Sequence, residues 1–481
     1  MMMSRVRNRI KKASWFTLFL VSTFLLLGLL SPLTAMAAEE TALAIDTGDT
    51  AFIIICAALV MLMTPALAMF YGGMVRKKNV LSTLMHGFIT ICVVSIIWVL
   101  YGYSLAFAPD VAGIVGNLDW AGFIGVGLDP NPDIVETIPH QLFAVFQLMF
   151  AIITVAIISG SFAERIRFPA FLLFIAIWVT VIYAPLAHWV WGGGWIDEMG
   201  ALDFAGGTVV HISSGVTGLV LAILLGKRRG WGGSNGHTMA PHQLPMTVLG
   251  GALLWFGWFG FNAGSALAAD GIAVAAFVTT NTATAAGALG WIAYEWIRQG
   301  KPTMLGAVSG AIAGLVAITP AAGFVTPLAA IPMGFISGII CYQAILMKSR
   351  LGYDDSLDAF GIHGVGGIWG ALATGLFATT MVNADGADGL FYGNAELLLI
   401  QTIAVVATII FVTIGTFVIY HIVNSIVKMR VSAEDEEIGL DISQHGEEAY
   451  PDFISPSGVA TSSSIATSSS PVVQKTIPTQ S

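Results

Sequence analysis

Long apolar runs separated by short charged clusters constrain this chain more than any other feature. The stretch AVVATIIFVTIGTFVIYHIV, residues 404–423, contains no Asp, Glu, Lys or Arg. A helix of this length spans roughly 30 Å, the thickness of the hydrocarbon core of a bilayer. Only 10% of all residues are charged, against roughly 25% in soluble domains. A soluble fold of this size could not solvate its surface, so the chain is predicted to be a membrane protein.

The apolar runs favour helices over a β-barrel. Only helices and closed barrels satisfy their backbone groups in lipid, and barrel strands alternate in polarity. Continuous runs such as residues 96–107 therefore predict an all-α polytopic membrane protein. The net charge is −9 and there is no basic patch, which argues against nucleic-acid binding. All three cysteines fall in apolar spans and are expected to be buried, without a disulfide framework: Cys56, Cys92 and Cys341.

The spacing of Lys and Arg predicts the topology. Basic residues recur in small clusters, whereas the loops 108–138 and 381–394 hold Asp and Glu but neither Lys nor Arg. The positive-inside rule places each basic cluster in the cytoplasm. One span fits before the first cluster and two fit in each later interval, which gives eleven spans, N-terminus out and C-terminus in. Their expected limits are 50–75, 83–107, 140–163, 168–190, 205–225, 244–266, 272–297, 303–321, 324–347, 358–380 and 395–427.

An odd number of spans suggests a five-plus-five inverted repeat with one extra helix. The fifth span begins DFAGGTVVHISSG and the tenth begins DAFGIHGVGG, each with Asp, then Phe, then His, then small residues. Halves of five spans have opposite topology, so equivalent positions face each other. His211 and His363 are therefore predicted to meet near the midplane of the bundle.

The two ends of the chain differ from this core. Residues 1–37 combine five basic residues, an apolar run and Ala35-Met36-Ala37, the pattern of a cleaved signal peptide, with a retained first helix as the alternative. Residues 38–430 form the transmembrane domain. Residues 431–481 form a cytoplasmic tail that begins acidic and ends in Ser/Thr-rich low complexity, the end expected to be disordered. The acidic part is interpreted as a regulatory contact surface. The alternative is that its charges only keep the tail solvated.

Polar groups inside the spans carry the functional signal. A histidine in a span faces a bundle interior or a cavity, because exposing it to lipid is costly. A neutral His satisfied by a neighbouring helix is the ordinary alternative, but two at corresponding positions favour a pore or proton relay. Two His without carboxylate or thiol partners make a poor metal site. Asp203 stands at a helix start, where capping of backbone N–H groups competes with ligand contact. His188 and His242 are expected at an interface and in solvent.

Aromatic residues form a second constellation. Phe143, Phe146 and Phe150 share one helical stripe, and Trp258 and Phe261 lie toward the outer end of the sixth span. Aromatic belts and core Phe are ordinary in membrane proteins. Here, however, Ser265 follows one turn after Phe261, and aromatic faces with a hydroxyl can hold a small cation. Apolar walls and two imidazoles would follow below, which suits a cation that can lose a proton.

At these residues the chain resembles the ammonium transporter family, of the Amt/Mep/Rh type. The resemblance runs from about Thr50 to about Tyr450, and DFAGGTVVH and GWFGFNAGS are its most specific motifs. It implies a homotrimer with a pore in each subunit. It also implies that residues 438–450 of the tail dock a PII-type nitrogen-signalling protein. Its outer ammonium site maps to Phe150, Trp191 and Ser265 with Asp203 at the helix start, its gate to Phe146, Phe150, Phe261 and Trp258 with Gln147 close by, and its twin histidines to His211 and His363.

Residues and resemblance together predict an ammonium transporter of the plasma membrane, not an enzyme, without cofactor or metal. Ammonium binds at the outer aromatic site, loses a proton, and crosses as ammonia along the two histidines. Net proton transfer is expected, with neutral ammonia conduction as the competing version. An ammonium sensor signalling through its tail is the alternative function. A hydrolase is disfavoured, because HExxH is absent from the sequence and the single GxSxG match, residues 232–236, follows no strand.

Overall fold

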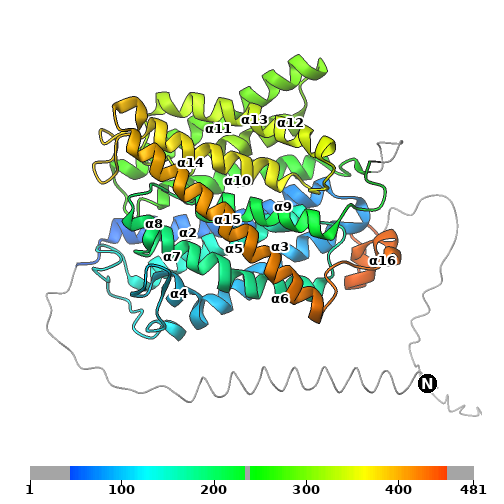
Figure 1. The fold of residues 1–481 in the computed structure, drawn as a ribbon, viewed down its shortest axis with the longest axis horizontal. Helices are drawn as coiled ribbons and strands as arrows, with labels where there is room; N and C mark the ends of the chain where they lie inside the picture. The colour runs from blue at the N-terminus through cyan, green and yellow to red at the C-terminus, as the bar shows by residue number, and fades with distance from the viewer. Residues whose placement is uncertain (1–43, 233–238, 452–481) are drawn as a thin grey trace, which may run out of the picture. The chain divides into compact units, whose positions relative to one another are not determined.

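The computed structural model describes residues 44–232 and 239–451. These ranges are mostly helical, with one short hairpin between β1 (Asp110–Val111) and β2 (Val115–Gly116). The predicted signal segment, most of the GxSxG match and the Ser/Thr-rich end of the tail lie outside the described residues. Figure 1 shows the helices running side by side, with α15 crossing obliquely over them. The chain is therefore an all-α membrane protein, as predicted.

The first five expected spans each correspond to a helical stretch. Two of these stretches contain a π-helical segment within the span, and a third begins with one. Their bounds are α2 (Thr47–Met74); η1 (Lys77–Asn79), α3 (Val80–Ile97), η2 (Trp98–Gly102) and α4 (Tyr103–Phe107); α5 (His140–Phe162); α6 (Phe168–Trp178), η4 (Val179–Tyr183), α7 (Ala184–Trp191) and α8 (Trp195–Glu198); η5 (Gly207–Ile212) and α9 (Ser213–Leu225). A short 3₁₀ turn, η3 (Ala121–Phe123), lies in the loop before α5.

The remaining six expected spans also coincide with helices. Their bounds are α10 (Leu244–Gly264); α11 (Gly271–Gln299); α12 (Met304–Ile318); α13 (Pro327–Leu351); η7 (Phe360–Gly364) and α14 (Val365–Phe377); and α15 (Ala395–Ile426), with a 3₁₀ turn η8 (Leu390–Tyr392) before it. Within the described residues, ten helical stretches are long and apolar enough to cross a membrane. The eighth expected span, α12, is the exception, because its 15 residues fall short of the ~20 that a bilayer core requires.

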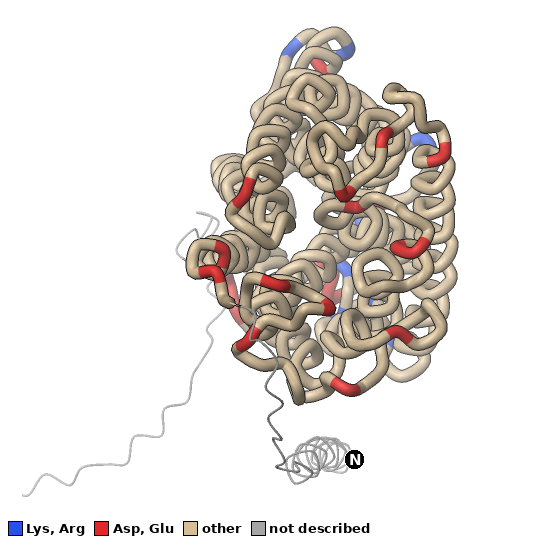
Figure 2. Tube along the Cα trace, turned by 90° about the vertical axis from the view of Figure 1, so that its left-hand side faces the viewer, with Lys and Arg blue, Asp and Glu red and all other residues tan. Residues whose placement is uncertain are grey.

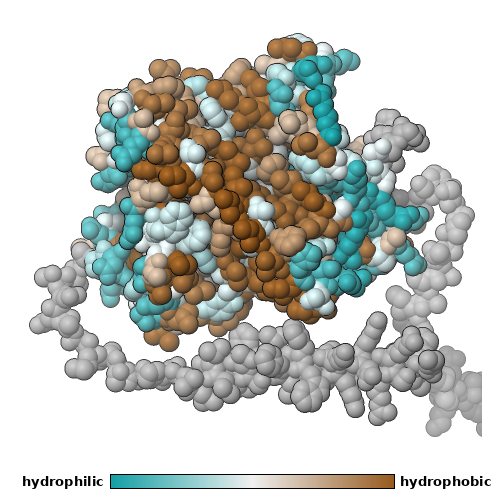
Figure 3. All heavy atoms as spheres, viewed as in Figure 1, coloured by the Kyte–Doolittle hydropathy of each residue, from teal (hydrophilic) through white to brown (hydrophobic). Residues whose placement is uncertain are grey.

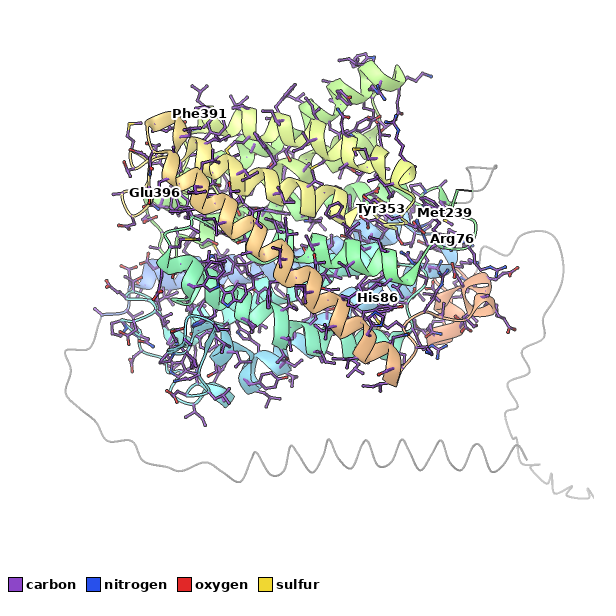
Figure 4. The ribbon with its side chains drawn as sticks, in the orientation of Figure 1. Arg76, His86, Met239, Tyr353, Phe391 and Glu396 are labelled. Carbon is purple, nitrogen blue, oxygen red and sulfur yellow. The ribbon has the colours of Figure 1, made fainter. Side chains whose placement is uncertain are left out.

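Apolar and polar surfaces are segregated along the helices. Figure 3 shows a broad hydrophobic belt over their middle and hydrophilic residues at both ends. One end, termed the acidic end, carries the loops 108–138 and 381–394. The other, termed the basic end, carries residues 76–78 and 227–229. Figure 4 places Phe391 and Glu396 at the acidic end and Arg76 and Tyr353 at the basic end. Such a belt between polar rims is the surface expected of a bilayer-spanning bundle.

Packing between the halves of the chain places α2 along α10, while α15 contacts α6, α9 and α14. Glycines allow the closest approaches. A Cβ on Gly250 of α10 would lie 2.4 Å from the backbone nitrogen of Phe70 in α2. Cys56 and Cys341 are buried as predicted, but Cys92 is exposed in this chain, because it lies on an outward face of α3.

The tail folds back onto the basic end through α16 (Ala433–Ile438) and η9 (Asp441–His445). The carboxylate of Asp441 accepts the backbone N–H groups of Leu81 at 3.0 Å and Ser82 at 2.7 Å. These donors stand in the first turn of α3, so the tail caps a membrane helix. At its end, the Tyr450 hydroxyl lies 3.2 Å from Nε2 of His242, which is part-buried rather than solvated as predicted.

A buried charged cluster lies beneath the tail. Glu164 accepts hydrogen bonds from the backbone N–H of Arg76 at 2.6 Å and from Nε of Arg76 at 3.0 Å, and it pairs with Arg228 at 3.1 Å. Arg228 also donates hydrogen bonds from Nε and Nη2 to the two carboxylate oxygens of Asp354, both at 2.9 Å. Burial opposes ionisation of Glu164, but Arg228 and Arg76 outweigh it and lower the pKa of this carboxyl. The cluster ties together loops that are far apart in sequence.

Candidate functional site

Two histidines meet where the fifth and tenth expected spans cross. His211 lies in η5 and His363 in η7, so each half of the chain contributes one imidazole from a π-helical turn. Their Nδ1 atoms are 3.2 Å apart and the two buried rings stack at 27°. A hydrogen bond between two Nδ1 atoms requires that one donates and the other accepts. The prediction that the side chains of His211 and His363 meet is therefore confirmed.

Small residues permit this crossing. A Cβ on Gly215, four residues after His211, would lie 2.2 Å from the backbone nitrogen of Gly364. Only glycine fits at that position, because the obstructing atoms belong to a backbone. A Cβ on Gly367 would similarly lie 3.0 Å from the Cβ of His211. The close contact therefore brings the two imidazoles within hydrogen-bonding distance.

Each histidine segment is capped by a carboxylate eight positions earlier. Asp203 accepts the backbone N–H groups of Gly206, Gly207 and Thr208 at 2.6–2.8 Å. In the other half, Asp355 accepts the N–H of Ala359 at 3.2 Å and that of Phe360 at 2.8 Å. Alignment of the two histidine motifs within the sequence paired Asp358 with Asp203. This pairing is wrong. Asp358 pairs instead with Lys348, and Asp355 holds the equivalent place.

Aromatic rings line the approach to the histidines from the acidic end. Phe150 stacks on Phe261 with centroids 4.3 Å apart, and Trp191 meets Phe150 edge-on at 6.0 Å. Phe146 also lies edge-on to Phe150, at 5.0 Å. The row continues inward, because Phe261 lies 6.2 Å from the ring of His211. Three of the predicted gate and outer-site residues, Phe146, Trp191 and Phe261, thus surround Phe150.

Trp258 flanks this row and stacks on His211, with ring centroids 5.3 Å apart. Its indole N–H donates to the hydroxyl of Thr319 at 2.9 Å. Thr319 lies in the turn that follows α12, and the sequence reasoning did not single it out. Because its hydroxyl satisfies the buried indole, Trp258 can present its ring face to the imidazole. The residues around Trp258 in the sequence do not indicate that Thr319 is its hydrogen-bond partner.

Outside the Phe150–Phe261 stack lies a cavity of about 300 Å³. Phe150, Trp191, Gln147 and Ser265 line it together with Asp133, Asp197 and further apolar side chains. The Ser265 hydroxyl donates its proton to the carbonyl of Phe261 at 2.9 Å. Its oxygen lone pairs are then left to accept a hydrogen bond from a cation. Ring faces and an acceptor oxygen together form a setting for a small cation.

Inside the stack the free space shrinks to about 10 Å³. His211, His363, Trp258 and Phe261 line this space, and the remaining lining is aliphatic or Met: Met63, Leu67, Ile153, Ile157, Val210 and Leu254. A volume of this size holds about one water-sized sphere. A hydrated ion therefore has no room between the Phe150–Phe261 stack and the histidines. A neutral molecule the size of water or ammonia is about as large as this space.

Asp203 does not line the outer cavity. Its side chain is buried, and both oxygens accept N–H groups of the turn that leads into η5. Its backbone carbonyl accepts the indole N–H of Trp191 at 2.8 Å. The carboxylate therefore caps the helix start and holds the segment that orients Trp191. The sequence left open whether Asp203 caps the helix or contacts the ligand. In this geometry it caps the helix.

His188 lies in α7, close to the end of the fourth expected span. It is fully buried, with Nδ1 3.0 Å from the carbonyl of Ala106 and Nε2 2.8 Å from the carboxylate of Asp110. The loop that follows α4 folds over α7 and covers the imidazole. Two further residues on the outer cavity, Asp133 and Asp197, were not predicted, because Asp133 lies in a loop and Asp197 in the four-residue helix α8, and neither segment is long enough to show a helical period. Within the described ranges, no group of three or more His, Cys, Asp or Glu could hold a metal ion.

Comparison with known proteins agrees with this arrangement. The Ammonium Transporter Family profile matches residues 51–450. An ammonium transporter of Bacillus subtilis is 63% identical over 406 residues, covering 84% of this chain and 99% of the relative. Ammonium transporter Amt1 of Archaeoglobus fulgidus is 47% identical over 403 residues, covering 84% and 99%.

Solved structures show the same fold. The crystal structure of Mep2 from Saccharomyces cerevisiae has a TM-score of 0.77 at 36% identity, covering 85% of this chain and 94% of that one. A structure titled Sensor Amt Protein has a TM-score of 0.76 at 28% identity, covering 83% and 98%. The paired histidines and their aromatic approach therefore stand in a chain that belongs to the ammonium transporter family.

Proposed function

We propose that this chain transports ammonium by separating the proton from ammonia between the outer cavity and the histidine pair. The observation that carries the proposal is the drop in free volume from about 300 Å³ to about 10 Å³ across the Phe150–Phe261 stack. Ammonium binds in the outer cavity against Phe150, Trp191 and the Ser265 oxygen. Taking the intact ion past the stack would leave a charge in apolar surroundings, at a large cost in free energy.

Transfer of the proton from ammonium to the imidazole of His211, which lines the space inside the stack, removes most of that cost. Ammonia then crosses beside His211 and His363, whose rings can donate and accept hydrogen bonds in turn. Potassium has no proton to lose and meets the full dehydration cost at the stack. The Nδ1–Nδ1 contact of 3.2 Å supplies a route for the proton from one ring to the next. The proposal is therefore electrogenic, with ammonia and a proton crossing together.

Ammonium-evoked current is the test. Purified protein in proteoliposomes on a solid-supported membrane is exposed to a step of ammonium chloride, with potassium chloride as control. The expected result is a current with ammonium and none with potassium. Uptake of methylammonium without current would support the competing neutral conduction of ammonia. Absence of both uptake and current would contradict transport.

A sensor function is the second candidate. It is supported by the tail, which caps α3 through Asp441 and so links the basic end to a membrane helix, and by the fold shared with the sensor structure. Expression in a host without its own ammonium transporters separates the two functions. Growth on low ammonium supports transport, whereas correctly inserted protein without uptake supports sensing.

The architecture of the transporter follows the same proposal. Eleven spans cross the plasma membrane, with α12 as the short eighth, in a five-plus-five inverted repeat followed by α15. The acidic end faces outward after residues 1–37 are removed, and residues 431–481 remain in the cytoplasm. Figure 2, which looks onto the acidic end, shows Asp and Glu positions spread over it. Three chains assemble, each with its own pore, and a PII-type protein docks on the tail.

A further inference from the structure

An apolar groove lies at the basic end of the bundle and has no part in the transport path proposed above. It runs between the C-terminal half of α9 and residues 351–360, which lead into η7. The two elements cross at Gly215 and Gly364, so the groove occupies the space on the basic side of that crossing. Its volume is about 530 Å³, and it shares no lining residue with the outer cavity or with the space around the histidines. Its walls are apolar: Leu219, Ala222, Ile223, Leu351 and Phe360.

The walls of the groove belong to the surface that meets the bilayer. Ile223 lies in α9 and Leu351 ends α13, and these two residues are 58% and 67% exposed. Both helices belong to stretches that are long and apolar enough to cross a membrane. An exposed apolar side chain on such a helix contacts acyl chains, which are as apolar as Leu itself. A groove surrounds a chain on more sides than a flat helix face does, so it gains more dispersion contacts. The groove is therefore suited to part of an acyl chain.

A cation stands where the groove reaches the basic end. Lys227 lines the groove together with Tyr353, which Figure 4 shows at this end of the bundle. The Lys227 ammonium lies 4.6 Å from the ring centroid of Trp231, and in the described part of the chain no carboxylate pairs with it. The backbone carbonyl of Lys227 accepts a hydrogen bond from Nη2 of Arg430 at 2.7 Å, which fixes the start of the side chain. Basic and aromatic side chains of this kind are typical of the headgroup layer.

The carboxylate on the groove does not oppose an anion. Asp354 accepts hydrogen bonds from the backbone N–H, Nε and Nη2 of Arg228 at 2.8–2.9 Å. Burial opposes ionisation of Asp354, but the hydrogen bonds from Arg228 outweigh it and lower the pKa of this carboxyl. Arg165 lies 3.9 Å from the same side chain. The charge of Asp354 is therefore compensated within the protein, and the ammonium of Lys227 remains for a ligand.

We propose that this groove binds an anionic phospholipid, with an acyl chain along the apolar walls and the phosphate on the ammonium of Lys227. Basic pockets between membrane helices bind anionic headgroups because one molecule satisfies both the apolar and the charged part. A zwitterionic lipid offers the same chains, but its own cationic group lies close to the phosphate and weakens the attraction to a lysine. The site therefore prefers an anionic headgroup. It stands apart from the transport function, because none of its residues lies on the proposed path.

The test is photo-crosslinking of a phosphatidylglycerol whose acyl chain carries a diazirine to the purified full-length chain in detergent micelles. Labelled peptides are identified by mass spectrometry, and label is expected on residues 219–226 and 351–360. Unlabelled phosphatidylglycerol should compete at about fivefold lower concentration than phosphatidylcholine with the same chains. Lys227→Gln is expected to weaken phosphatidylglycerol about fivefold and to remove this preference, whereas Lys227→Arg keeps it. Lys428→Gln removes an exposed charge at the same end, outside the groove, and should behave as wild type.

Four results would overturn the proposal. Equal weakening in Lys227→Gln and Lys428→Gln would show that general surface charge attracts the lipid. Label spread evenly over the apolar belt, without headgroup preference, would show ordinary bilayer contact. Competition by inorganic phosphate as strong as that by phosphatidylglycerol would show a site for a free anion. Cross-links between chains in place of lipid label would show that a second copy covers the groove. If Lys227→Gln does not fold, the two competing lipids on wild type and on Lys227→Arg still decide.

Discussion

At the scale of single residues, the histidine pair is the feature that most directly links structure to transport. His363→Ala removes one of the two Nδ1 atoms that lie 3.2 Å apart and enlarges a space of about 10 Å³. The substitution breaks the proton route that we propose and gives water or ions more room. We expect the ammonium-evoked current to fall at least tenfold, or selectivity over potassium to be lost. His242→Ala, which alters a histidine at the basic end, is the matched control and leaves the current unchanged.

The Asp203 carboxylate offers a second prediction at this scale. Asp203→Asn keeps one acceptor oxygen, which can still receive the N–H groups of Gly206 and Gly207, but puts an NH2 group in place of the oxygen that accepts the N–H of Thr208. Because this buried N–H is left unpaired, stability is expected to fall by about 1–3 kcal/mol, seen as a lower melting temperature in detergent. Because the same segment orients Trp191, affinity for methylammonium falls too. Stability equal to wild type would show that the cap is not structural.

At the scale of elements, the crossing of α9 with η7 is the tightest constraint on the site. Gly215→Ala would place a Cβ 2.2 Å from the backbone nitrogen of Gly364, so one segment must move and the histidines separate. We expect about 1–3 kcal/mol of destabilisation and loss of transport. Gly271→Ala is the control, because its Cβ would meet open space at the start of α11. Normal transport in Gly215→Ala would contradict the requirement for close contact.

At the scale of the whole molecule, the buried cluster around Glu164 makes stability depend on pH. Arg228 and Arg76 lower the pKa of Glu164 despite its burial. A carboxyl with a lowered folded-state pKa stabilises the fold above its unfolded pKa, ~4.3, and loses that contribution as pH falls through the folded value. The melting temperature of wild type should therefore drop below about pH 4.

Glu164→Gln isolates this contribution. The substitution leaves Arg76 without its carboxylate and is expected to cost about 3–5 kcal/mol at neutral pH. The difference in melting temperature between wild type and variant should shrink as the pH falls below about 4, because both side chains are then uncharged. A difference that stays constant between pH 7 and pH 3 would show that the ion pairs do not carry it.

Much of the fold was predictable from the sequence because lipid imposes a simple rule. Long uncharged runs must be helical, so the limits of α2, α5, α10 and α15 lie within a few residues of their expected positions. The meeting of His211 and His363 followed from their matching places in two halves. The length of α12 did not, because the helix ends in turns that continue the same apolar composition.

Sequence alone determined the membrane class, the helical content and the identity of the two imidazoles that meet inside the bundle, because hydrophobicity and small-residue patterns act locally along the chain. Only the tertiary structure decided that Asp355 rather than Asp358 caps the second histidine segment, and that His188 is buried. It also brought Asp133, Gln147 and Asp197 to one cavity. These contacts join segments far apart in sequence, and the backbone path that connects them leaves no periodic trace in the residues themselves.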